Sequence, residues 1–123
     1  MSDQVTGAGT APLSRSIRRG DLVFLSGAVP IRPDGTLAGE GIEEQTEHVL
    51  RRLDEELRTH GGDRADIAKV TVLLADPDRD WAAMNKVYRA FFAEPMPARS
   101  AYGVHLAAEG LLVEIEAIAV LGG

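Results

Sequence analysis

The chain has 123 residues, of which 45% are hydrophobic and 26% are charged, and its formal net charge at pH 7 is -6. This length predicts one domain with a real core, and the sequence holds no apolar run long enough to cross a bilayer. Because cysteine is absent, disulfides, thiolate metal ligands and a thiol nucleophile are excluded. The acidic balance argues against binding to nucleic acid.

Residues 1–10 are polar and glycine-rich, with neither a basic start nor an apolar stretch. We therefore expect a flexible N-terminus, no secretion signal and a cytoplasmic location, with a single domain over residues 11–123. A strand is weakly indicated at residues 14–18. The run DLVFLSGAV, residues 21–29, predicts a buried strand because it is rich in β-branched and large apolar residues. The Pro-Asp-Gly sequence that follows predicts a turn.

Two helices are predicted, with a strand between them. The first covers residues 42–60, where apolar residues recur at helical spacing, and Gly61 ends it. The β-branched run at 67–75 predicts a strand, and Asp76 followed by Pro77 predicts the cap of the second helix. That helix carries an apolar stripe that we expect in the core: Trp81, Met84, Tyr88, Phe91 and Phe92. Two strands are predicted after it, at residues 99–104 and 112–121.

The order β-β-α-β-α-β-β predicts an α+β fold in which one sheet has both helices on the same face. The strand at 67–75 carries apolar side chains on both faces. On one face we expect Ala68, Val70, Val72 and Leu74, and on the other Ile67, Thr71 and Leu73. Because a monomer rarely leaves a wide apolar sheet face in water, we infer an oligomer.

The last two strands carry charged residues among apolar ones. Alternation along the final strand places Val113, Ile115, Ala117 and Ala119 toward the helices, and Glu114 and Glu116 toward the face that oligomerisation covers. A partly buried carboxylate needs a partner, and Arg99 of PMPARSAY is the nearest candidate if these two strands pair. A structural ion pair and glutamates on an open, wet face are the alternatives.

Several stretches occur in an order and at intervals that resemble the RidA/YjgF family of enamine and imine deaminases. They are LVFLSGAVP, EEQTEHVLRRL, DWAAMNKVYRAFF, PARS and LVEIEAIAV, and together they cover residues 11–121. The resemblance implies a chorismate-mutase-like ββαβαββ fold that assembles as a homotrimer, with a central barrel and pockets between neighbouring subunits. It also implies a small carboxylate-bearing substrate and no metal or organic cofactor.

The same resemblance assigns roles to individual residues. Arg99 would bind the substrate carboxylate and Glu114 would act as acid and base. The main chain at Gly27 and Ala101 would line the pocket, with Ser26 close by and Asn85 more distant and structural. Leu13 stands where characterised members have a tyrosine, so one pocket hydroxyl is lost, and Ala101 replaces a common cysteine while keeping its N–H. Ala28 stands where glutamine is common, and these changes predict a more apolar pocket.

The activity that the resemblance implies is hydrolysis of 2-enamino and 2-imino acids to 2-oxo acids and ammonia, a hydrolase reaction on C=N bonds. A planar guanidinium can hold a carboxylate through two hydrogen bonds, and a nearby carboxylate can move the proton of a water. Two alternatives remain open: a pathway-specific enzyme for another imine, enamine or carbonyl compound, and a non-catalytic module that binds small carboxylates. Ribonuclease activity, described for some members, is disfavoured by the net charge and by the lack of a histidine pair.

Overall fold

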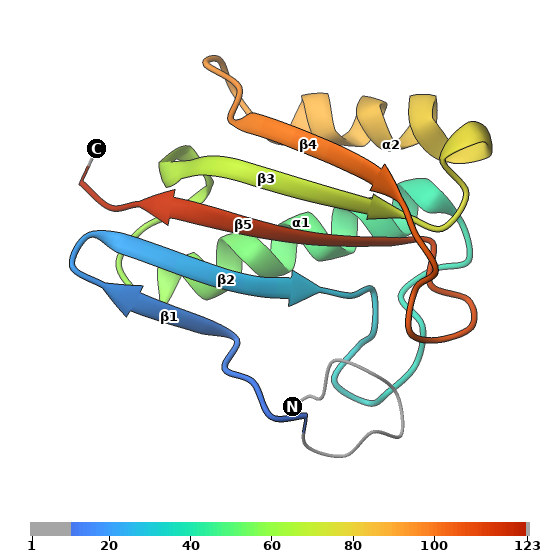
Figure 1. Cartoon of the computed structure of the whole chain (residues 1–123), viewed down its shortest axis with the longest axis horizontal. Helices are drawn as coiled ribbons and strands as arrows, with labels where there is room; N and C mark the ends of the chain where they lie inside the picture. The colour runs from blue at the N-terminus through green and yellow to red at the C-terminus, as the bar shows by residue number, and fades with distance from the viewer. Residues whose placement is uncertain (1–10, 123) are drawn as a thin grey trace.

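The computed structural model describes residues 11–122, so the flexible N-terminus expected at 1–10 lies outside the described residues. One sheet of five strands has two helices on the same face, and the α+β fold predicted from the sequence is confirmed (Figure 1). The strands are β1 Ser16–Arg19, β2 Leu22–Ala28, β3 Ile67–Leu74, β4 Ala98–Gly103 and β5 Val113–Val120. The helices are α1 Ile42–Arg58 and α2 Pro77–Phe91, and a short 3-10 helix, η1 Arg64–Asp66, was not predicted.

The order of strands across the sheet is β1-β2-β5-β3-β4. β3 and β4 run parallel, and every other neighbouring pair is antiparallel. The last strand of the chain therefore lies in the middle of the sheet, and β4 forms one edge. This order, visible in Figure 1, decides which candidate residues can meet.

The helices form as their patterns predict, with one exception. The apolar stripe of α1 is buried to 2% exposure or less at Val49, Leu50, Leu53 and Leu57. Asp76 caps α2 by accepting a hydrogen bond from the Arg79 N–H at 3.2 Å, and Pro77 follows at the first helical position. The prediction was wrong for Trp81, which is 44% exposed because it faces the Arg99 guanidinium instead of the apolar core.

The face of the sheet that packs on the helices is apolar along β2, β3 and β5, as predicted for β5. Its buried residues include Val70, Val72, Leu74, Val113, Ile115, Ala117 and Ala119. Ile67 is also buried among them, so its predicted position on the opposite face was wrong. The pairing register shifts between Ile67 and Lys69, and this irregularity turns Ile67 back toward the helices.

The other face of the sheet has no helix over it, and several large apolar side chains on it are exposed. Ile17, Leu22, Phe24, Tyr102 and Val120 are each between 37% and 57% exposed. They lie beside one another in the strand register: Ile17 opposite Phe24, and Leu22 opposite Val120. We inferred an oligomer from the apolar residues on both faces of the strand at 67–75. The exposed apolar side chains on β1, β2, β4 and β5 agree with that inference, which stays a prediction.

A buried amide fixes the loop that leads into β5. The Gln45 side chain, fully buried on α1, donates hydrogen bonds to the carbonyls of Gly39 at 3.0 Å and Gly110 at 2.9 Å. Its oxygen accepts from the Leu112 N–H at 2.8 Å. Because removal of one partner would leave the others unpaired in the core, this amide holds the start of the strand that carries Glu114. Along residues 11–122 no helix has the length and apolar character needed to traverse a bilayer.

Candidate active site

Glu114 lies near the start of β5, on the face of the sheet that the helices leave open. Its neighbours Val113 and Ile115 are fully buried beneath the helices, so the alternation of the strand turns Glu114 the other way. It sits opposite Leu73 of β3. The side chain is half-buried, and within residues 11–122 no hydrogen-bond donor or cation pairs with it. Burial raises the pKa of Glu114 above its ordinary value, and the charge of Glu116 raises it further.

Gly27 lies directly against Glu114, as the predicted pocket requires. A Cβ placed on Gly27 would collide with the Glu114 carboxylate. The register of β2 against β5 shifts between Leu25 and Ala28, and Gly27 falls inside this irregular segment. Glycine is therefore needed here for close approach, and the main chain of β2 passes next to the carboxylate.

Arg99 lies on the edge strand β4 and is held by α2. Its Nη1 donates a hydrogen bond of 2.7 Å to Oδ1 of Asn85, so Asn85 contacts Arg99 directly rather than lying at a distance. The guanidinium carbon lies 4.8 Å from the ring centre of Tyr88 and 5.4 Å from that of Trp81. These contacts fix the plane of the guanidinium on the helix side of the sheet. A cavity of about 320 Å³ opens there, lined by Asn85, Tyr88, Arg89, Glu94, Met96, Pro97 and Arg99.

Arg99 and Glu114 do not meet within one chain. The last two strands do not pair, because β3 lies between β4 and β5, so the ion pair considered from the sequence is absent. Arg99 is also opposite Val70, a helix-facing residue, whereas Glu114 is opposite Leu73 on the open face. Ala101, opposite Val72, shares the face of Arg99. A site that contains both the guanidinium and the carboxylate therefore needs a second copy of the chain.

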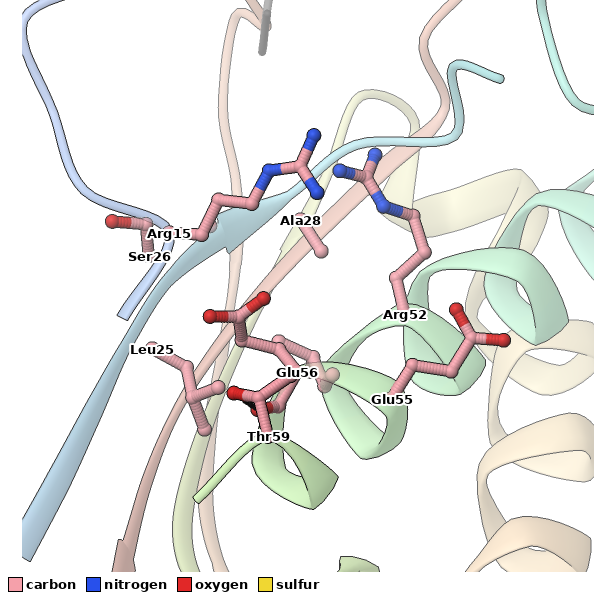
Figure 2. A pocket seen from close by; sticks show the side chains of 10 residues that line it. Arg15, Leu25, Ser26, Ala28, Arg52, Glu55, Glu56 and Thr59 are labelled. Atoms are coloured by element: carbon pink, nitrogen blue, oxygen red, sulfur yellow. Dashed lines mark hydrogen bonds between the residues drawn. The ribbon is translucent and has the colours of Figure 1, made fainter. Parts of the chain in front are cut away.

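Ser26 and the segment before β1 lie side by side. The Ser26 hydroxyl donates to the carbonyl of Ser14 at 2.6 Å, and the Ser26 N–H donates to the carbonyl of Arg15 at 3.0 Å. Leu13, on the same segment, is 47% exposed. A pocket of about 220 Å³ lies between this segment, β2 and α1, and Ser26 and Gly27 line it together with Arg15 and Arg52 (Figure 2).

The two arginines of this pocket were not singled out as site residues from the sequence. A signal was available for Arg52, because it lies three residues after the buried Val49 and is therefore its neighbour on the helix surface. Among residues 11–122, no group of three or more histidine, aspartate or glutamate side chains is arranged to hold a metal ion.

One sheet with two helices on one face, an arginine held by α2 at the sheet edge and a half-buried glutamate on the open face define a small α+β domain whose candidate site residues lie on both faces. Residues 5–121 match the profile of the family described as Endoribonuclease L-PSP. The chain belongs to this family, which also carries the names RidA and YjgF.

Curated relatives and solved structures agree with this assignment. The chain is 38% identical over 122 residues to "Reactive Intermediate Deaminase A, chloroplastic" of Arabidopsis thaliana, covering 98% of this chain and 65% of that protein. It is 38% identical over 116 residues to the "2-iminobutanoate/2-iminopropanoate deaminase" of Mus musculus, covering 94% and 85%. The crystal structure of RidA from Psychrobacter sp. PAMC 21119 superposes with a TM-score of 0.85 at 32% identity, covering 98% and 97%. A YjgF family protein from Neisseria meningitidis gives 0.80 at 37% identity, covering 91% and 90%.

Proposed function

We propose that this protein hydrolyses reactive 2-enamino and 2-imino acids to the corresponding 2-oxo acids, releasing ammonia. The observation that carries the proposal is Glu114, a half-buried carboxylate against the main chain of Gly27 that no cation of the described chain neutralises. Two relatives at 38% identity, one named a reactive intermediate deaminase and the other a 2-iminobutanoate/2-iminopropanoate deaminase, support the same chemistry.

Arg99 is the group that binds the substrate carboxylate in this proposal. Its hydrogen bond to Asn85 uses one of the five N–H donors of a guanidinium, and the rings of Tyr88 and Trp81 restrict its plane. A guanidinium oriented in this way can offer two parallel N–H donors to a carboxylate. The adjacent C=N bond is then held in one orientation, which lowers the entropic part of the barrier.

Glu114 moves the proton. In its ionised form it accepts a proton from a water whose oxygen bonds to C2 of the imine, and a carbinolamine forms. The protonated Glu114 returns this proton to nitrogen, which completes the carbinolamine. Glu114 then takes the proton of the carbinolamine hydroxyl and passes it to nitrogen as C2=O forms, so that the C–N bond breaks and ammonia leaves with the 2-oxo acid as product. Because burial and Glu116 raise the pKa of Glu114, its two protonation states lie closer in free energy near neutral pH than those of an exposed glutamate.

We propose further that the working form is a homotrimer in which each site lies between neighbouring subunits, with Arg99 from one and Glu114 from the other. Two observations support this assembly. The two side chains lie on opposite faces of the sheet, and the open face leaves Phe24 43% exposed and Tyr102 57% exposed. Burial of such a surface between copies would supply a substantial driving force for association.

The decisive test is ammonia release from imines that an amino-acid oxidase generates in the same cuvette. The wild-type protein is expected to accelerate imine decay, and the Arg99→Ala variant is expected to lose most of this acceleration. Full activity of a correctly folded Arg99→Ala variant would overturn the assigned role. Tight binding of 2-oxo acids without any ammonia release would instead identify a carboxylate-binding module.

A further inference from the structure

Trp81 is a large aromatic side chain that stays exposed beside the arginine that binds the substrate carboxylate in the proposed reaction. It is 44% exposed, and the Arg99 guanidinium carbon lies 5.4 Å from its ring centre. Tyr88, the other ring that contacts this guanidinium, is only 5% exposed. Tyr88 is therefore part of the core, whereas Trp81 presents apolar ring surface to a molecule that binds at Arg99.

The contacts between α2 and β4 place Trp81 beside Ala101. Asn85, one turn later on α2, accepts a hydrogen bond of 2.7 Å from the arginine of β4. Pro77, one turn earlier, approaches Gly103 so closely that a Cβ on this glycine would lie 2.7 Å from Cγ of the proline. Trp81 is midway between Asn85 and Pro77 on α2, and Ala101 is midway between their two contacts on the same face of β4. The ring therefore lies alongside a methyl group, which is too small to cover it.

The main chain of β4 places a further hydrogen-bond donor beside this ring. β4 is an edge strand, and the N–H of Val104, which follows it, donates to the carbonyl of Leu74 in β3 at 2.9 Å. Because every second residue of a parallel strand bonds to its neighbour, the Ala101 N–H points toward the open edge of the sheet. A carboxylate that accepts from Arg99 and from this N–H lies on the Trp81 side of the guanidinium. The substrate carbons that follow the carboxylate are then within reach of the ring.

The two sides of the Arg99 guanidinium differ in the surface that they offer to a substrate side chain. On the side away from Trp81, the cavity of about 320 Å³ carries the charges of Arg89 and Glu94. An apolar chain placed there would withdraw these charges from water without replacing their hydrogen bonds. On the other side, the indole ring and the Ala101 methyl group provide apolar surface. The apolar part of a substrate is therefore favoured against Trp81.

We infer that Trp81 forms the wall of the side-chain subsite, so that the preferred substrates are 2-imino and 2-enamino acids with a large apolar side chain. This inference rests on the proposed deamination, which places the substrate carboxylate at Arg99. Packing a side chain on an exposed ring removes apolar surface of both partners from water. A methyl group would leave most of the ring in water, so affinity should rise with the size of the apolar side chain.

Binding is measured by isothermal titration calorimetry on the intact protein with the 2-oxo acid products. The probes are 4-methyl-2-oxopentanoate and pyruvate, which share the 2-oxo acid group and differ in the side chain, isobutyl against methyl. The wild-type protein is expected to bind 4-methyl-2-oxopentanoate at least about tenfold more tightly, as burial of a leucine-sized side chain against one apolar wall implies. Trp81→Ala is expected to reduce this ratio to about twofold or less. Trp81→Phe keeps an aromatic wall and is expected to retain most of it.

The ratio of the two affinities distinguishes a subsite wall from a residue that only supports Arg99. Loss of the contact between Trp81 and the guanidinium would weaken the binding of both probes by the same factor and leave the ratio unchanged. Lys86→Ala is the matched control, because Lys86 is an exposed residue of the same helix that pairs with Glu43 of α1 at 3.6 Å. The inference is overturned if the wild-type protein binds neither probe or binds both equally. It is also overturned if Trp81→Ala leaves the ratio unchanged or if Lys86→Ala lowers it to the same extent.

Fluorescence reports on the ring directly, because Trp81 is the sole tryptophan of the 123-residue chain. Saturation with 4-methyl-2-oxopentanoate is expected to change the emission more than saturation with pyruvate, and with the Kd that calorimetry gives. Emission that responds to neither probe, although calorimetry detects binding, would show that the ring lies away from the side chain and would overturn the inference. Ammonia release from the imines of leucine and alanine is measured in parallel. If neither imine is hydrolysed, the proposed function fails, while the affinity ratio still decides whether Trp81 forms the subsite wall.

Discussion

The sharpest prediction concerns where the two halves of the active site come from. Arg99 and Glu114 lie on opposite faces of the sheet with β3 between their strands, so one chain cannot present both to a single substrate. An Arg99→Ala protein and a Glu114→Gln protein should each be inactive alone. Mixed assemblies of the two should nevertheless recover activity, because some interfaces combine the intact Arg99 of one subunit with the intact Glu114 of its neighbour.

The expected recovery follows from counting. At equal amounts and random association, half of the subunits at a given interface provide an intact Arg99, and half of their neighbours provide an intact Glu114. About a quarter of the sites are then complete, whatever the number of subunits in a closed ring. The mixture should show about a quarter of the wild-type rate of ammonia release when the rate is divided by the total number of subunits.

The assay needs the two variants co-expressed in equal amounts and purified without selection for mixed assemblies, with the subunit composition confirmed by native mass spectrometry. Wild-type protein mixed equally with Arg99→Ala is the control, and it should keep about half of its sites. No recovery in verified mixed assemblies would refute a site shared between subunits. If activity recovers although the two variants form no stable complex, the proposed oligomer is refuted as well.

Three further outcomes follow from the described contacts. Asn85→Ala should raise KM about tenfold with a smaller change in kcat, because the 2.7 Å hydrogen bond that orients the Arg99 guanidinium is lost; an unchanged KM in steady-state assays would contradict this role. Tyr88→Phe should leave the protein as stable or up to about 1 kcal/mol more stable in urea, since the buried Tyr88 hydroxyl has no partner among the described residues. Glu114→Gln should raise Tm at pH 7, and this gain should disappear below pH 4.5, the ordinary pKa of the group.

The sign of the last effect follows from the direction of the pKa shift. The folded protein raises the pKa of Glu114, so the folded state holds this proton more tightly than the unfolded chain does. The contribution of protonated Glu114 to the free energy of unfolding is fully present below the pKa of this group in the unfolded chain. It is lost as the pH rises through the pKa of Glu114 in the folded protein. A neutral glutamine removes the dependence, and a thermal shift series from pH 4 to pH 8 on the wild-type and Glu114→Gln proteins measures it.

The helices and most strands were predictable because their signals are local. The 3.6-residue period alone predicts that Val49, Leu50, Leu53 and Leu57 form one buried stripe. The residue preferences at helix starts alone predict that α2 begins at Asp76 and Pro77. Trp81 shows the limit of the same method, since periodicity places a side chain on a face but does not say whether an arginine or the core lies beneath it.

The candidate site was predictable by residue type and family resemblance, but not by arrangement. The sequences of β3, β4 and β5 do not show that the last strand inserts between β2 and β3. Their apolar patterns are compatible with several strand orders, because parallel and antiparallel pairing bury the same alternate side chains. Asn85 was assigned a more distant, structural place from the resemblance alone, whereas the return of β4 beside α2 brings it into hydrogen-bond contact with Arg99.

Under the proposed assembly, the same strand order would give the oligomer interface a role in chemistry as well as in stability. Placing β5 in the middle of the sheet keeps Glu114 away from Arg99 in its own chain, and β4 at the edge carries Arg99 where a neighbouring subunit can approach. In the proposed assembly, each isolated chain would carry a half-buried carboxylate that no cation of the described residues neutralises and that lacks its substrate-binding partner. Assembly would supply the substrate-binding cation and desolvate the carboxylate further, so that a folded monomer would bind poorly and turn over slowly even with every residue intact.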